Sequence, residues 1–88
     1  MTIEELKQYL GDNKPSYSKV SMAELANIMI FVNVCLKMNE KTLDYYYSIN
    51  VDELLKSKMP TTELDTLKDD GWSLSDDESE LFLYLNIV

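Results

Sequence analysis

Apolar residues recur at helical spacing at the start of the chain and predict a first helix over residues 3–10. Thr2 and Glu5 have the spacing of a capping box, in which each side chain bonds the other residue's backbone amide. Gly11 follows where a helix commonly ends in a left-handed residue. The apolar face of this helix consists of Ile3, Leu6 and Leu10.

A longer apolar pattern predicts a central helix over residues 22–38. Ser21 and Glu24 form a second capping box at its start. From Ile28 onward apolar residues cover nearly the whole circumference, so we expect the rest of the chain to surround this helix. The alternative is a strand, because β-branched residues alternate in this run. The length of the segment and its cap favour the helix and predict that Cys35 is a small buried hydrophobic residue.

The middle of the chain predicts an extended piece followed by a helix. Tyr45–Tyr47 fit either a short strand or an irregular extended segment. Asn50 and Glu53 form a third capping box, which begins a helix over residues 51–58. Pro60 ends this helix, because the residue before a proline is driven away from helical geometry.

A further short helix is expected after this proline. Thr61 or Thr62 can cap its first turn, since both hydroxyls can accept a bond from a free backbone amide. Leu64 and Leu67 lie on one face of it, and Gly71 provides its end.

The last segment predicts a β-hairpin, with strands at residues 72–74 and 81–88 and a polar turn between them. In the second strand alternate apolar residues would face the core, with Phe82 and Tyr84 on the other side. The terminal strand would form a sheet edge and invite pairing with another chain. The alternative is a terminal amphipathic helix, because Ser75 and Glu78 match the capping-box pattern.

Taken together, these elements predict one small globular domain over residues 1–88, of class α+β and mainly helical. A central buried helix is accompanied by shorter helices and a small C-terminal β-hairpin. An all-α small bundle is the alternative, should the last segment be helical. The 88-residue length is that of a single domain with a modest core.

Charge changes this picture more than any motif. The chain carries a net charge of −8, and residues 61–88 hold eight carboxylates against one lysine. The first sixty residues are close to neutral. The acidic C-terminal segment therefore holds nearly all the net charge, and it predicts either a solvated surface or a surface that recognises a basic partner.

Several classes of chemistry are disfavoured. The chain has no histidine and no arginine, which removes the commonest general base and the planar group that binds phosphate. The acidic charge opposes direct nucleic-acid binding. No calcium loop, nucleophile motif or glycine-rich phosphate loop occurs, so we expect no catalytic residues, no metal and no cofactor. Without a secretory signal or an apolar run of about 20 residues, we expect a cytoplasmic protein without membrane contact.

The preferred hypothesis is a non-enzymatic, acidic protein-binding module. Its partner would be a basic, nucleic-acid-binding host protein, which it would inhibit or modulate. In the most specific version of this hypothesis, the carboxylates imitate the backbone of a nucleic acid. Such chains are often accessory proteins of phages or mobile elements, in which case the cytoplasm is that of the host. The partner-binding candidates are the acidic and aromatic residues of the last segment: Glu63, Asp65, Asp69, Asp70, Trp72, Asp76, Asp77, Glu78, Glu80, Phe82 and Tyr84.

A second set of candidates is aromatic. Tyr45, Tyr46 and Tyr47 cannot all face inward on a regular element, so at least one ring is expected at the surface, where aromatic residues anchor interfaces. The alternative function is a structural subunit of a virion or other assembly that acts through self-association. It depends on these aromatic residues and on the apolar terminal strand.

Overall fold

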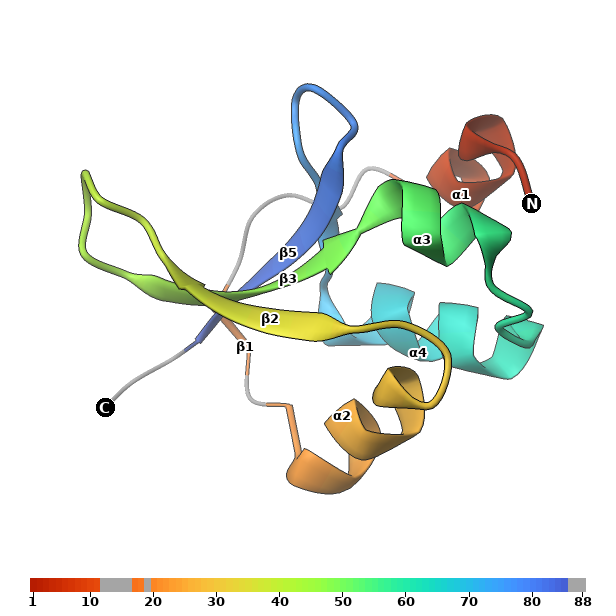
Figure 1. Cartoon of the computed structure of the whole chain (residues 1–88), viewed down its shortest axis with the longest axis horizontal. Coiled ribbons are helices and arrows are strands. Elements are labelled where there is room, and N and C mark those ends of the chain that lie inside the picture. The colour runs from red at the N-terminus through yellow and green to blue at the C-terminus, as the bar shows by residue number, and fades with distance from the viewer. Residues whose placement is uncertain (12–16, 19, 86–88) are drawn as a thin grey trace.

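The computed structural model describes residues 1–11, 17–18 and 20–85, and it combines four helices with a five-stranded sheet (Figure 1). The elements, in chain order, are α1 (Ile3–Leu10), β1 (Tyr17–Ser18), α2 (Met22–Met29), β2 (Val34–Met38), β3 (Tyr45–Asn50), α3 (Val51–Lys56), α4 (Thr61–Asp70), β4 (Ser73–Leu74) and β5 (Glu80–Leu85).

The sheet has the strand order β1-β5-β3-β2, and β4 also pairs with β5. Three of its pairings are antiparallel, β2 with β3, β3 with β5 and β4 with β5, whereas β1 runs parallel to β5. β4 pairs with the first half of β5 and β1 with its second half, on the side away from β3. β5 is therefore a central strand, and β2 is a free edge of the described sheet. The expectation that the terminal strand is an edge was wrong.

The predicted central helix is the largest error. Helix α2 ends at Met29, where the amides of Phe31 and Val32 both bond the carbonyl of Ile28, and the chain re-enters the sheet as β2. Each of the five β2 residues pairs with a residue of β3 that lies seven to fifteen positions further along the chain. Local spacing along the chain does not record which strands pair with one another. The alternative interpretation, a strand based on the alternating β-branched residues between positions 28 and 34, also misplaced the strand, because only the last of these residues, Val34, lies in β2.

The fold is therefore α+β, but it is not mainly helical, and the all-α bundle was also wrong. The core lies between the helices and one face of the sheet. Ile49, Leu81 and Leu83 provide the strand side of this core, and each is at most 1% exposed. The helices contribute Leu6, Leu10, Leu25, Ile28, Leu54, Leu64 and Leu67.

Some of the predicted helix caps are present in the structure and others are not. Thr2 and Glu5 form both bonds of the capping box, and Asn50 accepts the amide of Glu53. Helix α4 differs, because Pro60 occupies its N-cap and neither threonine caps it. Gly71 adopts the left-handed geometry expected after this helix (φ 91°, ψ 19°). Gly11 has a positive φ of 61° but a ψ of −139°, which is not left-handed helical.

The C-terminal hairpin is present, with Ser73 opposite Phe82 and Leu74 opposite Leu81. The Ser75–Glu78 pattern forms the turn of this hairpin rather than a helix cap, since the amide of Glu78 bonds the carbonyl of Ser75. The end of the expected strand, residues 86–88, lies outside the described residues, as does the turn predicted around Pro15.

Candidate functional site: the open face of the sheet

The face of the sheet opposite the core, called the open face here, takes no part in the described core. Side chains alternate along a strand, so the residues between the core positions all point to this side. The registers of β2, β3 and β5 align them in rows across the sheet. The open face consists of Cys35, Lys37, Tyr46, Ser48, Asn50, Glu80, Phe82 and Tyr84.

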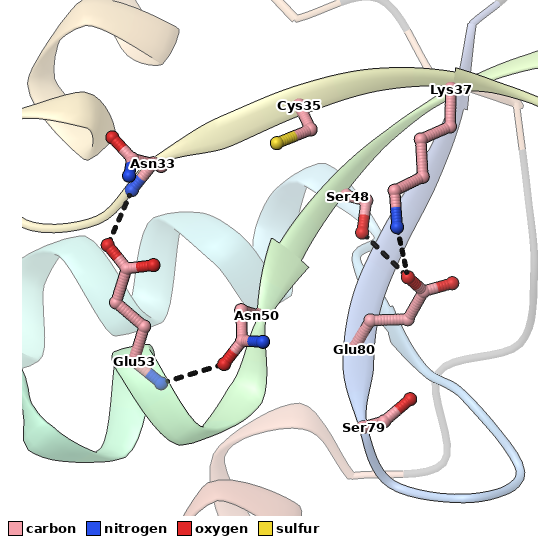
Figure 2. Close-up of a pocket in the computed structure, with 8 residues that line it drawn as sticks. All are labelled: Asn33, Cys35, Lys37, Ser48, Asn50, Glu53, Ser79 and Glu80. Atoms are coloured by element: carbon pink, nitrogen blue, oxygen red, sulfur yellow. Dashed lines mark hydrogen bonds and ion pairs between the residues drawn. The ribbon is translucent and has the colours of Figure 1, made fainter.

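A polar pocket of about 350 Å³ occupies one half of the open face (Figure 2). It lies where β2, β3 and β5 meet the start of α3 and the end of the hairpin turn. Every residue that lines it except Cys35 carries a polar oxygen or nitrogen in its side chain: Asn33, Lys37, Ser48, Asn50, Glu53, Ser79 and Glu80.

Glu80 forms the centre of this pocket. Its Oε2 accepts one bond from Lys37 Nζ (3.1 Å) and one from Ser48 Oγ (2.8 Å), as Figure 2 shows. The hydrogen bond to Glu80 and then the charge of Glu80 raise the pKa of Lys37. Lys37 therefore stays a cation at neutral pH, which fits an ion pair and does not fit a nucleophilic amine.

The opposite end of the pocket is closed by a link between β2 and α3. Glu53 Oε1 accepts the backbone amide of Asn33 (3.1 Å), and Asn50 Oδ1 accepts the amide of Glu53 (3.0 Å). Cys35 lies between the two ends and its sulfur points into the pocket. Its side chain is exposed, so the expectation of a buried cysteine was wrong. The reason is the strand geometry, which places Cys35 on the open face.

An aromatic hollow of about 160 Å³ adjoins the polar pocket and shares Glu80 with it. Its walls are Tyr46, Phe82 and Tyr84, with Asn39 at the rim. The three ring centroids lie 5.6–6.3 Å apart, and the ring planes are inclined at 62–78°. Asn39 Nδ2 donates to Tyr84 Oη (3.4 Å) and thereby helps to hold the third ring.

The acids of α4 lie elsewhere. In Figure 1 this helix lies below α3 on the right, away from the hairpin turn at the top. Asp65 and Asp69 are exposed there, and Glu63 is half-buried. Asp70 faces Glu24 of α2, and burial, followed by the hydrogen bond and charge of Glu24, raises the pKa of Asp70 to about 7.

The acids of the hairpin turn form another separate group. Glu78 pairs with Lys7 of α1 (3.0 Å). Asp77 accepts bonds from Ser75 and Ser79, which lower its pKa to about 2, and Asp76 is exposed beside it. The predicted acidic residues thus lie in at least three environments and do not form one surface.

The predicted aromatic residues also separate. Trp72 is fully buried in the core and cannot act as a surface contact. Tyr47 packs against the core, and Tyr45, two positions earlier in β3, is exposed on that same side of the sheet. Of all the candidates, the structure brings together Tyr46, Glu80, Phe82 and Tyr84.

Sequence reasoning missed the polar partners of these four residues. Lys37, Ser48 and Asn50 are brought to Glu80 only by strand pairing. The signal available was the alternation of polar and apolar residues from Val34 to Met38, which becomes informative once this segment is assigned as a strand.

No family model, no characterised protein and no solved structure matches this chain. Among the described residues, no group of three or more metal-ligating side chains occurs, and no helix is both long and apolar enough to cross a membrane. The geometry of the open face is therefore the basis for a functional proposal.

Proposed function

We propose that this protein is a non-enzymatic protein-binding module, cytoplasmic, and that the open face binds a protein partner with a basic surface. The observation that carries the proposal is the aromatic hollow beside Glu80. Three aromatic residues on adjacent strands stay out of the core and line a concave surface next to a carboxylate. Partly exposed aromatic groups of this kind are typical anchors of protein interfaces.

The rigidity of the site supports this function. Tyr46 is paired with Tyr84 across β3 and β5, and Phe82 lies on the same central strand, with neighbours on both sides. A partner would therefore meet side chains that are already ordered, so less conformational entropy is lost on binding. The net charge of −8 favours encounter with a basic partner, and a nucleic-acid-binding protein is the class that this charge fits best.

The geometry gives less support to nucleic-acid mimicry. Mimicry requires carboxylates in a regular array that are charged and available, and here they are divided between α4, the hairpin turn and β5. Glu78 pairs with Lys7 of this chain, and the raised pKa of Asp70 leaves it only partly ionised near neutral pH. We therefore place the contact surface at the aromatic hollow, where one carboxylate accompanies three rings.

The test is affinity capture with matched variants. Wild-type protein, Phe82→Ala and Tyr45→Ala would be immobilised, and bound proteins would be identified from a lysate at low and high salt. Tyr45 is a matched control because it is an exposed aromatic residue of β3 that lies on the other side of the sheet. We expect a basic protein that binds wild-type and Tyr45→Ala and is lost with Phe82→Ala. Binding that is indifferent to Phe82→Ala or to salt would contradict the proposal.

The edge strand β2 favours a second candidate function, self-association. Leu36 and Met38 of this strand are 59% and 45% exposed, and the edge presents unpaired backbone groups. Residues 34–50 contain two lysines and two carboxylates, so this hairpin is neutral within an acidic chain. A second copy could approach here with the least repulsion.

Sedimentation from 5 to about 500 micromolar would test self-association. We expect a dimer that Leu36→Lys disrupts and Met22→Lys does not, since Met22 is an exposed apolar residue (77%) in the first turn of α2 and is not part of the β2 strand. A monomer over the whole range would contradict this second candidate and leave the first one untouched.

A further inference from the structure

We propose that the aromatic hollow is a binding site for a single side-chain cation, the ammonium of a lysine or the guanidinium of an arginine of the partner. This inference rests on the proposed function, because it names the chemical group through which the basic partner would be recognised.

The arrangement of the rings is the first argument. Tyr46, Phe82 and Tyr84 have planes inclined at 62–78° to one another, so they form a corner and not a stack. The faces of aromatic rings carry negative partial charge, and a cation within about 6 Å of a ring centroid is attracted to it. A corner made of three rings offers such a face on more than one side of a bound cation.

The size of the hollow is the next point, because the hollow must hold an ammonium or guanidinium group. Its volume of about 160 Å³ exceeds the ~30 Å³ that one water molecule occupies in the liquid. There is thus room for an ammonium or guanidinium group with the last carbons of its stem. Those carbons would contact the rings while the charge stays near the opening, which is how long basic side chains are commonly accommodated.

The carboxylate at the rim is the second argument. Oε2 of Glu80 is bound by Lys37 and Ser48, whereas its other oxygen points away from both (Figure 2). Among the described residues, Oε1 of Glu80 has no hydrogen-bond donor. It can accept a bond from an incoming cation, which would add a charge-assisted hydrogen bond to the attraction of the rings.

The ion pair with Lys37 shows that the Glu80 carboxylate can bind an ammonium group on the open face. The ammonium of Lys37 lies 3.1 Å from Glu80 Oε2, and its side chain is about half exposed (48%). The Lys37 side chain would therefore compete with a partner's cation for the charge of Glu80. Removal of this competitor is expected to strengthen binding, which no purely apolar site would predict.

The experiment is a titration of the isotope-labelled protein with three capped tripeptides, followed through the ring resonances of Tyr46, Phe82 and Tyr84. The peptides are acetyl-Gly-Lys-Gly-amide, acetyl-Gly-Arg-Gly-amide and acetyl-Gly-norleucine-Gly-amide, the last as a neutral analogue of the first. We expect one or both cationic peptides to bind roughly fivefold more tightly than the norleucine peptide. Comparison of the lysine and arginine peptides decides between ammonium and guanidinium.

Three variants sharpen the test. Glu80→Gln is expected to reduce the preference for the cation, Lys37→Met to strengthen binding of the cationic peptide about threefold, and Tyr45→Ala to leave it unchanged. Equal binding of the three peptides, or binding that Lys37→Met leaves unchanged or weakens, would overturn the cation site.

The two proposals can fail separately. If a captured partner depends on Phe82 while the peptides show no preference for a cation, the protein-binding function stands and the cation site is refuted. If the cationic peptides bind but no captured protein depends on Phe82, the cation site stands and the protein-binding function is refuted.

Discussion

Asp70 makes the stability of this protein depend on pH in an unusual direction. It lies at the C-terminal end of α4 and faces Glu24 of α2. Asp70 Oδ2 and Glu24 Oε2 are both buried, and no donor in the described part of the chain reaches either atom. A proton held between the two carboxyl groups satisfies both oxygens, and the negative end of the helix dipole favours the neutral form further. Asp70→Asn replaces this proton with an amide that can donate to Glu24 permanently.

The size of the effect follows from the pKa of Asp70, which rises from 3.8 to about 7, first through burial and then through Glu24 and Asp69. Each pKa unit corresponds to about 1.36 kcal/mol, so the whole difference would amount to about 4 kcal/mol for a fully buried group. Because Asp70 is only half-buried, solvent screening reduces this to about 1–2 kcal/mol.

The bound proton decides whether the stability of the protein rises or falls with pH. Between pH 3.8 and about 7 the folded protein retains a proton that the unfolded chain releases. The contribution of Asp70 to stability is therefore fully present below this window, falls as the pH rises through it, and is lost above it. Asp70→Asn is expected to stabilise the protein at pH 8 by about 1–2 kcal/mol, with an advantage that shrinks towards pH 4.

Urea unfolding followed by the fluorescence of Trp72 measures this effect, since Trp72 is the single tryptophan and is fully buried. Asp65→Asn is the matched control, because it removes the same charge from an exposed position of α4. If Asp70→Asn and Asp65→Asn have the same pH profile, or if Asp70→Asn destabilises the protein at pH 8, the reasoning is refuted.

Three further predictions concern single groups. Asp77, whose pKa is lowered to about 2 by bonds from Ser79 and Ser75, should remain ionised at pH 3 in a carboxyl-carbon NMR titration; half-protonation near pH 4 would contradict this. Asn50→Ala removes the cap of α3 and should cost about 1 kcal/mol in urea unfolding, so an unchanged midpoint would exclude the cap as a contributor. Cys35 should react with a thiol reagent without denaturant, and protection until unfolding would show that it is covered.

The candidate site shows how far local patterns reach. Alternation along the last strand correctly placed Leu81 and Leu83 in the core and Phe82 and Tyr84 on the opposite face, because side-chain period depends only on the local backbone. The sum of charges along the chain correctly gave an acidic last segment. That sum does not say on which surface of the folded protein each carboxylate lies. The structure distributes these carboxylates over separate surfaces.

The sequence by itself determined the helix starts at Thr2 and Asn50, the end of α4 at Gly71 and the C-terminal hairpin, since caps, turn residues and alternation act within a few residues. Only the tertiary structure decided that residues 34–38 form a strand, because its backbone groups find partners in β3. Because of the same pairing, β2 and not the terminal strand is an edge of the described sheet, and Lys37 lies beside Glu80. Contacts between residues distant in the chain depend on which strands pair, and no local period records that choice.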